Sequence, residues 1–216
     1  EAPREVPIVR DIINVKSVKL TFREDGIPVL KVSLFGDDTD TEFAKAVADI
    51  ISKNPKGLVV DLRNNPGGLL DKAVVMASAM LPAGSTVVIE EDGKGEQKRE
   101  RARGGDKLSQ IPTMILINEG SASASEILAG ALKDNRANVT LVGKKSFGKG
   151  SVQVVIPTSK DTSVKITVAR WLTPKGNQIN EQGIMPDVDV DISADDIKNG
   201  RDPQLDRAIE DLLKSI

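Results

Sequence analysis

The chain has 216 residues, of which 39% are hydrophobic, and 30 Lys and Arg against 32 Asp and Glu give it a net charge of -2. This length and composition predict one globular domain, or one domain with a small appendage. The near-neutral charge argues against a general nucleic-acid binder. No apolar run of the sequence approaches the roughly 20 residues that cross a bilayer.

The residue types that the sequence lacks restrict its chemistry further. Without Cys, the chain cannot form disulfides, thiolate nucleophiles or zinc–thiolate sites. Without His, it cannot use a Ser-His-Asp or Cys-His mechanism or a His-containing zinc site. Tyr is also absent, so a general base must be Asp, Glu or Lys. Among these options, the composition favours the Ser-Lys type for a serine enzyme, with Asp and Glu left open as alternative bases.

In chain order, residues 1–16 are rich in charge and Pro and predict a linker or the end of a missing element. The chain begins with Glu and not Met, so we expect a piece of something longer. After residue 16, hydrophobic periodicity predicts a hairpin and then alternating helices and strands. The predicted segments are a hairpin of 17–22 and 29–35, a helix over 39–53, a strand over 57–62, a helix over 69–80, a strand over 86–90, a solvated hairpin or loop over 91–107, a strand over 113–118, a helix to about 134, a strand over 139–142, β segments over 152–157 and 164–172, an alternating segment over 188–190 and a helix that starts at 202–203.

This alternation predicts an α/β fold with a parallel sheet and right-handed crossovers. Functional groups in such folds lie at the carboxyl ends of the strands. Two helix starts also carry the spacing of a capping box, Thr39 with Glu42 and Ser123 with Glu126.

Three loops follow three predicted buried strands, and the first of them, 64–68, contains Gly67 and Gly68 at a helix start. Backbone amides at a helix start have no partner within the helix and lie at the positive end of its dipole. They could form an oxyanion hole. The alternative is a plain Pro-Gly-Gly turn.

The second loop carries Ser121, Ser123 and Ser125 between an apolar strand and a helix. A strand, a tight turn and a helix start are the usual setting of an exposed nucleophile. The simpler interpretation of the stretch alone is a helix cap, with Ser123 and Glu126 as its two members.

The third loop, 143–150, places Lys149 between two glycines. The ordinary interpretation is a solvated charge, whereas a general base would need a buried lysine. Gly143 and Gly148-Lys149 also match the start of a P-loop. Gly150 stands where that motif needs Ser or Thr, and the next residues predict a strand and not a helix, which argues against a nucleotide.

Taken together, these segments resemble the C-terminal processing peptidases, also called tail-specific proteases. The resemblance covers most of the chain and rests on several specific motifs in the family's order. The motifs are Asp61–Gly68 (DLRNNPGG), Gly120–Ile127 (GSASASEI), Ser146–Gln153 (SFGKGSVQ), Leu172–Gly176 (LTPKG) and Gly183–Asp187 (GIMPD).

The resemblance implies a role for individual side chains. Ser123 matches the family's nucleophile, Lys149 its general base, and Gln153 the residue that assists or orients the lysine.

The resemblance also implies an oxyanion hole made of backbone amides. One amide would come from Gly67 or Gly68, a choice that the sequence leaves open, and the other from Ala124.

The implied fold is a crotonase-like α/β core over residues 17–216, with a parallel sheet, flanking helices and small β elements. Residues 1–16 would be a linker or the remnant of the PDZ domain that members of the family normally carry there. That domain captures the carboxyl termini of substrates. The family works outside the cytoplasm, at the periplasmic or cell-surface side, and is often tethered to a membrane, so an extracytoplasmic location is expected.

The implied activity is a serine endopeptidase that cleaves unstructured or C-terminal regions of proteins through an acyl-enzyme, with no metal or cofactor. Its partners would be protein or peptide substrates, with neither nucleotide nor nucleic acid, and homo-oligomers are left open. The alternative is a catalytically resting or non-catalytic peptide-binding module, because the PDZ domain is missing. A Lys149 amine within hydrogen-bond reach of the Ser123 hydroxyl would favour the enzyme.

Overall fold

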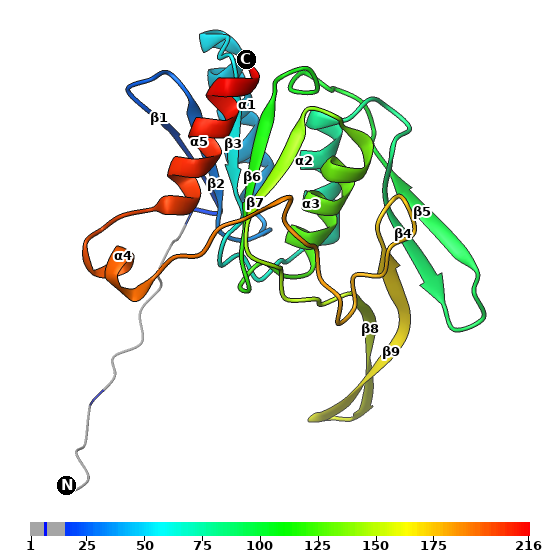
Figure 1. Cartoon of the computed structure of the whole chain (residues 1–216). Coiled ribbons are helices and arrows are strands. Elements are labelled where there is room, and N and C mark those ends of the chain that lie inside the picture. Colours follow the sequence, from blue (N-terminus) through cyan, green and yellow to red (C-terminus); the bar gives the residue numbers. More distant parts are fainter. Residues whose placement is uncertain (1–6, 8–15) are drawn as a thin grey trace, which may run out of the picture.

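The computed structural model describes residue 7 and residues 16–216, so the prediction for residues 1–16 lies almost wholly outside the described residues. Helices and strands alternate along the described part (Figure 1). Their bounds are β1 Val18–Phe22, β2 Pro28–Val32, α1 Thr39–Lys53, β3 Leu58–Asp61, α2 Leu70–Met80, β4 Thr86–Asp92, β5 Gln97–Arg101, β6 Thr113–Ile117, α3 Ala124–Asn135, β7 Val139–Gly143, β8 Ser151–Ser159, β9 Thr162–Leu172, β10 Val188–Asp189, α4 Ala194–Lys198 and α5 Pro203–Ser215.

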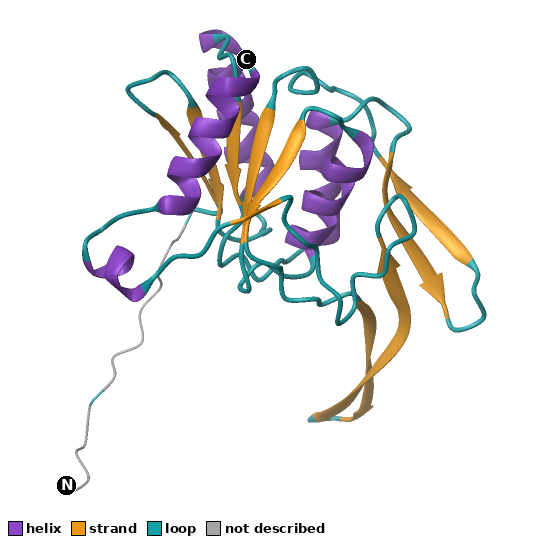
Figure 2. Ribbon diagram, in the orientation of Figure 1, coloured by secondary structure: helices purple, strands orange, loops and turns teal. Residues whose placement is uncertain are grey.

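The main sheet has the order β1-β2-β3-β6-β7-β10. β1 pairs antiparallel with β2, and every other neighbouring pair in this sheet is parallel. Helices cover both faces of it (Figure 2). The predicted α/β class with a parallel sheet and flanking helices is therefore confirmed.

Apolar side chains of the central strands point alternately into two cores. Val60 and Ile115 face the larger core beneath α1, α2 and α3. Val59 and Leu116 face the smaller core beneath α5. β3 and β6 are buried along their whole length, as expected for parallel strands covered on both faces.

A second, antiparallel sheet has the order β5-β4-β9-β8. The segment predicted as a solvated hairpin or loop, 91–107, contributes β5 and its turn to this sheet. The hairpin of β8 and β9 projects from the body of the molecule (Figure 1). Cross-strand pairs place Val154 opposite Ile166 and Ile156 opposite Val164, and all four side chains are exposed.

Thr39 does not cap α1, and the capping box predicted there is wrong. Asp38 is the N-cap residue, and Thr39 is buried as the first residue of the helix. The Thr39 hydroxyl donates to Ser17 Oγ at 2.9 Å and accepts from the Gly36 amide at 2.9 Å. Glu42 pairs with lysine side chains instead. The sequence pattern fails because Thr39 has tertiary partners that local spacing does not show.

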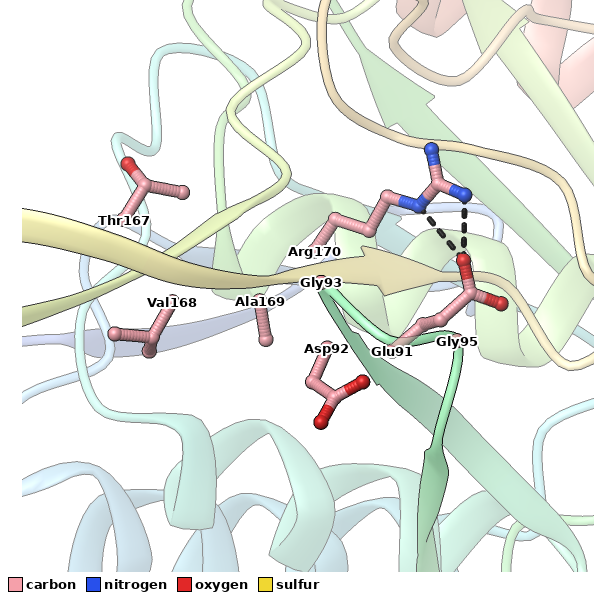
Figure 3. A pocket seen from close by; sticks show the side chains of 8 residues that line it. All are labelled: Glu91, Asp92, Gly93, Gly95, Thr167, Val168, Ala169 and Arg170. Atoms are coloured by element: carbon pink, nitrogen blue, oxygen red, sulfur yellow. Dashed lines mark hydrogen bonds and ion pairs between the residues drawn. The ribbon is translucent and has the colours of Figure 1, made fainter.

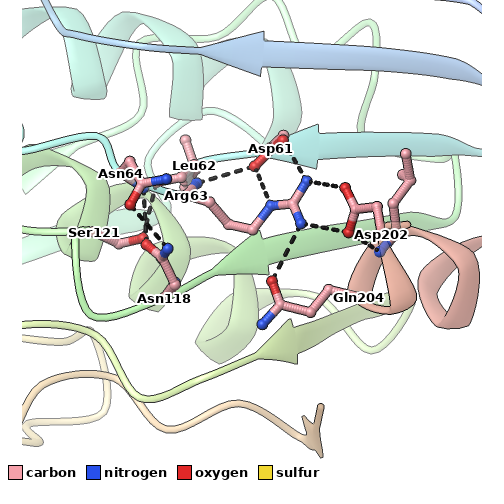
Figure 4. A network of polar contacts seen from close by, with 9 residues as sticks. Asp61, Leu62, Arg63, Asn64, Asn118, Ser121, Asp202 and Gln204 are labelled. Carbon is pink, nitrogen blue, oxygen red and sulfur yellow. Dashed lines mark hydrogen bonds and ion pairs between the residues drawn. The ribbon is translucent and has the colours of Figure 1, made fainter. Parts of the chain in front are cut away.

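A buried ion-pair network fixes α5 to the end of β3 (Figure 4). The Arg63 guanidinium donates to Asp61 from Nε and Nη2, each at 2.9 Å. It donates to Asp202 from Nη1 at 2.7 Å and from Nη2 at 2.8 Å. Asp202 is also the N-cap of α5, because its carboxylate accepts from the Leu205 amide. One cation therefore holds two chain segments that are far apart in sequence.

Replacing Arg63 with Met should lower the free energy of unfolding by about 2 kcal/mol, because the buried Asp61 carboxylate loses its cation and the partly exposed Asp202 carboxylate loses the same partner. Denaturant unfolding measures the change. Arg99, which is exposed on β5, provides the control, and Arg99→Met should change stability by less than about 0.5 kcal/mol. Equal effects of the two substitutions would contradict the role assigned to the network.

Stability should also fall in acid through Asp202. Burial alone raises the pKa of Asp202, but the hydrogen bonds and charge of Arg63 and the bond from the Leu205 amide outweigh burial and hold the pKa below its ordinary value. A carboxyl whose folded pKa is depressed stabilises the fold above the unfolded pKa of about 3.9. That contribution is lost as the pH falls through the folded pKa.

Unfolding measured from pH 7 down to pH 2, the range that brackets the ordinary pKa of about 3.9, should therefore show a shallower acid limb in Asp202→Asn than in the parent chain. Asn still caps a helix, so the cap is retained. Asp206→Asn in the same helix turn is the control. An unchanged acid limb in Asp202→Asn would exclude this carboxyl as a source of acid sensitivity.

Candidate active site

The loops that follow β3, β6 and β7 meet at one edge of the main sheet, at the lower end in Figure 1. The Asn64 amide donates to Asn118 Oδ1 at 2.8 Å, and Asn118 Nδ2 donates to Asn64 Oδ1 at 3.0 Å. These contacts join the first loop to the second (Figure 4). The Phe147 amide donates to the Ser121 carbonyl at 2.9 Å and joins the third loop to the second. The structure thus brings together the three loops that the sequence singles out.

The three serines of the second loop differ in what their hydroxyls do. Ser121 Oγ donates to the Leu62 carbonyl at 2.8 Å, and Ser125 Oγ donates to the Asn65 carbonyl at 2.9 Å. Both of these serines are fully buried and fasten the loop to its neighbour. Ser123 is half-buried, so its side chain is the accessible one of the three.

Ser123 also has an unusual backbone. Its φ of 55° and ψ of -114° lie outside the regions that a residue with a Cβ normally occupies. Such strain persists only where the surroundings enforce it, and it is concentrated at functional sites. Ser123 is the N-cap residue of α3, and its amide donates to Glu126 Oε2 at 2.8 Å. The interpretations as helix cap and as exposed serine at a strand-to-helix turn therefore apply to the same residue.

The paired glycines of the first loop lie against this serine. A Cβ added at Gly67 would lie 2.7 Å from Ser123 Cβ and 3.0 Å from the Ala124 nitrogen, so only glycine fits there. The Gly67 amide itself donates to Asn65 Oδ1 at 2.9 Å. Among the described residues, neither the Gly68 amide nor the Ala124 amide donates a hydrogen bond. The sequence leaves the choice of glycine open, and this geometry favours Gly68 as donor and Gly67 as the close neighbour of the serine.

Lys149 is exposed, although Gly148 before it and Gly150 after it are buried. The burial that a general base needs is therefore not present in this structure. The reason lies in the flanking glycines, which are the residues buried against the loop formed by 179–183. A Cβ at Gly148 would lie 3.1 Å from Glu181 C, and a Cβ at Gly150 would lie 2.3 Å from the Asn180 nitrogen.

The lysine and its expected helper are not joined to the serine by side-chain contacts. In the described part of the chain, the Lys149 ammonium makes no hydrogen bond or ion pair, with Ser123 or with any other residue. Gln153 is exposed on β8, and its Nε2 donates across the hairpin to Thr167 Oγ1 at 3.3 Å. The Ser-Lys pairing and the helper role of Gln153 thus stay predictions.

The motif at residues 183–187 packs against the third loop. Gly183 has a φ of 63°, and a Cβ there would lie 2.6 Å from the Ser146 carbonyl oxygen. The Ile184 amide donates to Ser146 Oγ at 2.6 Å. The sequence gives no role to this motif beyond the family pattern, and it gives Glu126 only the role of a cap. Both turn out to contact the lysine loop.

The described residues hold no group of three or more Asp, Glu, His or Cys that could bind a metal ion. None of the helices in residues 16–216 is long and apolar enough to cross a membrane. A pocket of about 420 Å³ lies between the turn after β4 and strand β9, where Arg170 pairs with Glu91 (Figure 3). It includes neither the serine, the lysine nor the paired glycines, so it is separate from the three-loop site.

An α/β core that presents a strained, accessible serine at a strand-to-helix turn, beside backbone amides without a partner among the described residues, is typical of serine hydrolases. The chain belongs to peptidase family S41, whose model matches residues 26–190. It is 44% identical over 195 residues to the carboxy-terminal-processing protease of Bartonella bacilliformis. The aligned region covers 88% of this chain and 44% of that relative. The chain therefore spans less than half the length of this relative.

Solved structures agree with this family. The photosystem II D1 C-terminal processing protease superposes with a TM-score of 0.77 at 33% identity, over 83% of this chain and 49% of that protein. Mature CPAF superposes with a TM-score of 0.67 at 16% identity, over 84% of this chain and 50% of that one, and this likeness concerns the fold alone. The crotonase-like core expected from the sequence is thus confirmed.

The contact between Gly67 and Ser123 can be tested through stability. Gly67→Ala should lower the free energy of unfolding by about 3 kcal/mol, because a positive φ and a clash with the serine add up. Gly84→Ala is the matched control: its φ of +82° is similarly strained, but no atom lies within 4 Å of the added Cβ. That substitution should cost only about 1 kcal/mol. Equal losses in chemical denaturation would show that the contact contributes nothing.

Proposed function

We propose that this chain is the catalytic core of a serine endopeptidase that cleaves proteins in unstructured or C-terminal regions. The observation that carries the proposal is the geometry at Ser123: an accessible hydroxyl on a strained turn, with Gly67 in contact. The amides of Gly68 and Ala124 donate to no other group among the described residues, so they are available to stabilise a negative charge. The substrate class is taken from the relatives named for carboxy-terminal processing.

In the proposed reaction, Lys149 in its neutral form removes the Ser123 proton, and the serine oxygen attacks a peptide carbonyl. The tetrahedral oxyanion is stabilised by the Gly68 and Ala124 amides. The protonated lysine then gives its proton to the leaving amine, and water releases the acyl group from the serine.

Lys149 must be desolvated for this chemistry, because an ammonium in water is not a base at neutral pH. Since the lysine is exposed here, the substrate itself or a segment outside this chain would have to cover it. The backbone of Lys149 is already fixed, because its amide donates to Glu126 Oε2 at 2.9 Å.

A second candidate is a resting or purely peptide-binding module. The exposed lysine and the engagement of Gln153 with Thr167 favour it, because both keep the expected base and its helper away from the serine. If the chain is the enzyme core proposed above, we expect protein substrates and an extracytoplasmic location. We also expect a membrane tether in a longer protein.

Ser123→Ala and Lys149→Ala should each reduce cleavage of an unstructured protein by at least about 100-fold, because each removes a group that the acyl transfer needs. Mass spectrometry of the fragments measures the rate. Lys145→Ala is the matched control, an exposed lysine in the same loop, and it should cleave like the parent chain.

Parent-level cleavage by Lys149→Ala would reject the dyad. Parent-level cleavage by Ser123→Ala would reject the site. A parent chain that binds the substrate without cleaving it would favour the second candidate.

A further inference from the structure

The side chain that joins the serine loop to the lysine loop is Glu126. It is fully buried on the first turn of α3. Its Oε2 accepts from the Ser123 amide at 2.8 Å and from the Lys149 amide at 2.9 Å. Its Oε1 accepts from the Gly148 amide at 2.6 Å and from Ser146 Oγ at 2.6 Å.

Every partner of Glu126 is a hydrogen-bond donor, so both of its oxygens act only as acceptors. The Ser146 hydroxyl accepts from the Ile184 amide, which leaves its proton for Glu126. Among the described residues, no Lys or Arg side chain pairs with the carboxylate. A buried carboxylate without a cation has to be satisfied by a full set of donors, and the three amides and the hydroxyl supply that set.

The same oxygen of Glu126 receives the amides of Ser123 and Lys149. The two residues are 26 positions apart in the sequence, yet their backbones meet at one atom. The other oxygen receives Gly148, the residue before the lysine, and Ser146, which carries the contact on to Ile184. The starting points of the serine and lysine side chains are therefore fixed relative to each other by one carboxylate.

We propose that Glu126 is a positioning residue for the Ser-Lys pair, acting through the backbone of Ser123 and Lys149. This inference rests on the proposed function and deepens it. Glu126 takes no part in proton transfer or in binding the substrate. It holds the backbone from which Lys149 must reach Ser123, and a displacement of about 1 Å at such a site costs roughly 100-fold in rate.

Glu126→Gln is the decisive variant because it keeps the shape but offers only one acceptor oxygen. Whichever way the amide lies, its NH₂ group faces two donors. We expect kcat to fall about 100-fold, with KM changed less than about threefold, because the transition state is misaligned and the substrate surface is untouched. Ser146→Ala removes a single donor and should lower kcat about tenfold, which keeps the test open if Glu126→Gln folds poorly.

Amide hydrogen exchange measured by NMR supplies a second readout that does not depend on cleavage. In Glu126→Gln, exchange should become faster at Gly148 and Lys149. Ser78→Ala is the matched control, a buried hydroxyl on α2 that bonds the Val74 carbonyl and the Arg103 amide. Its loss should reduce stability while leaving kcat and the exchange of both loop amides unchanged.

The outcomes separate this inference from the proposed function. Cleavage that persists in Ser123→Ala overturns the proposed function. If Ser123→Ala and Lys149→Ala are inactive while Glu126→Gln keeps the parent kcat, only the positioning role is overturned. Faster exchange with unchanged kcat also overturns it, as does a lower kcat with unchanged exchange or a kcat loss shared by Ser78→Ala. A selective loss of kcat with faster exchange at Gly148 and Lys149 supports it.

Discussion

Parallel pairing of β3, β6 and β7 is the constraint on which the rest of the molecule depends. Three neighbouring strands that run in one direction deliver their following loops to one edge of the sheet. Burial on both faces makes this arrangement stable, since each strand sends alternate side chains into the core under α1, α2 and α3 and into the core under α5. The three loops of the site lie together because these three strands are parallel neighbours.

What converts three adjacent loops into one rigid surface is close backbone packing at glycines, together with buried polar contacts. Gly67 lies against Ser123, and Gly150 lies against Asn180, at distances that exclude any side chain. The hydroxyls of Ser121 and Ser125 donate to the carbonyls of Leu62 and Asn65, which follow β3. At the same edge of the sheet, on the face that α5 covers, Arg63 joins the start of α5 to the end of β3.

Most of this fold can be predicted from the sequence, because the hydrophobic pattern within one segment is enough to indicate most of its helices and strands. The apolar runs of β3 and β6 and the periodicity of α1 need no tertiary information, and the observed bounds differ from the predicted ones by a residue or two. Thr39 shows the limit: its spacing to Glu42 fits a cap, but a partner 22 residues away, Ser17, decides its environment. The short helix α4 was missed because none of its residues is buried.

The candidate site could be predicted in part for the same reason. Motifs identified Ser123 and the paired glycines, but which glycine has a free amide depends on Asn65, whose side chain takes the other. The exposure of Lys149 could not be predicted, because it depends on which residues of the loop face the segment 179–183. Glu126 has the spacing of a helix cap, and nothing local indicates that residues 146–149 fold back onto it.

The projecting β8–β9 hairpin bears on motion in the site. Beyond the residues of β9 that also pair with β4, Ala169–Leu172, the hairpin is a two-stranded ribbon with exposed side chains, and such a ribbon is only marginally stable on its own. β8 begins two residues after Lys149. Lys149 thus lies on the chain between a backbone amide that the buried Glu126 carboxylate holds and the strand that leads out into the projecting hairpin.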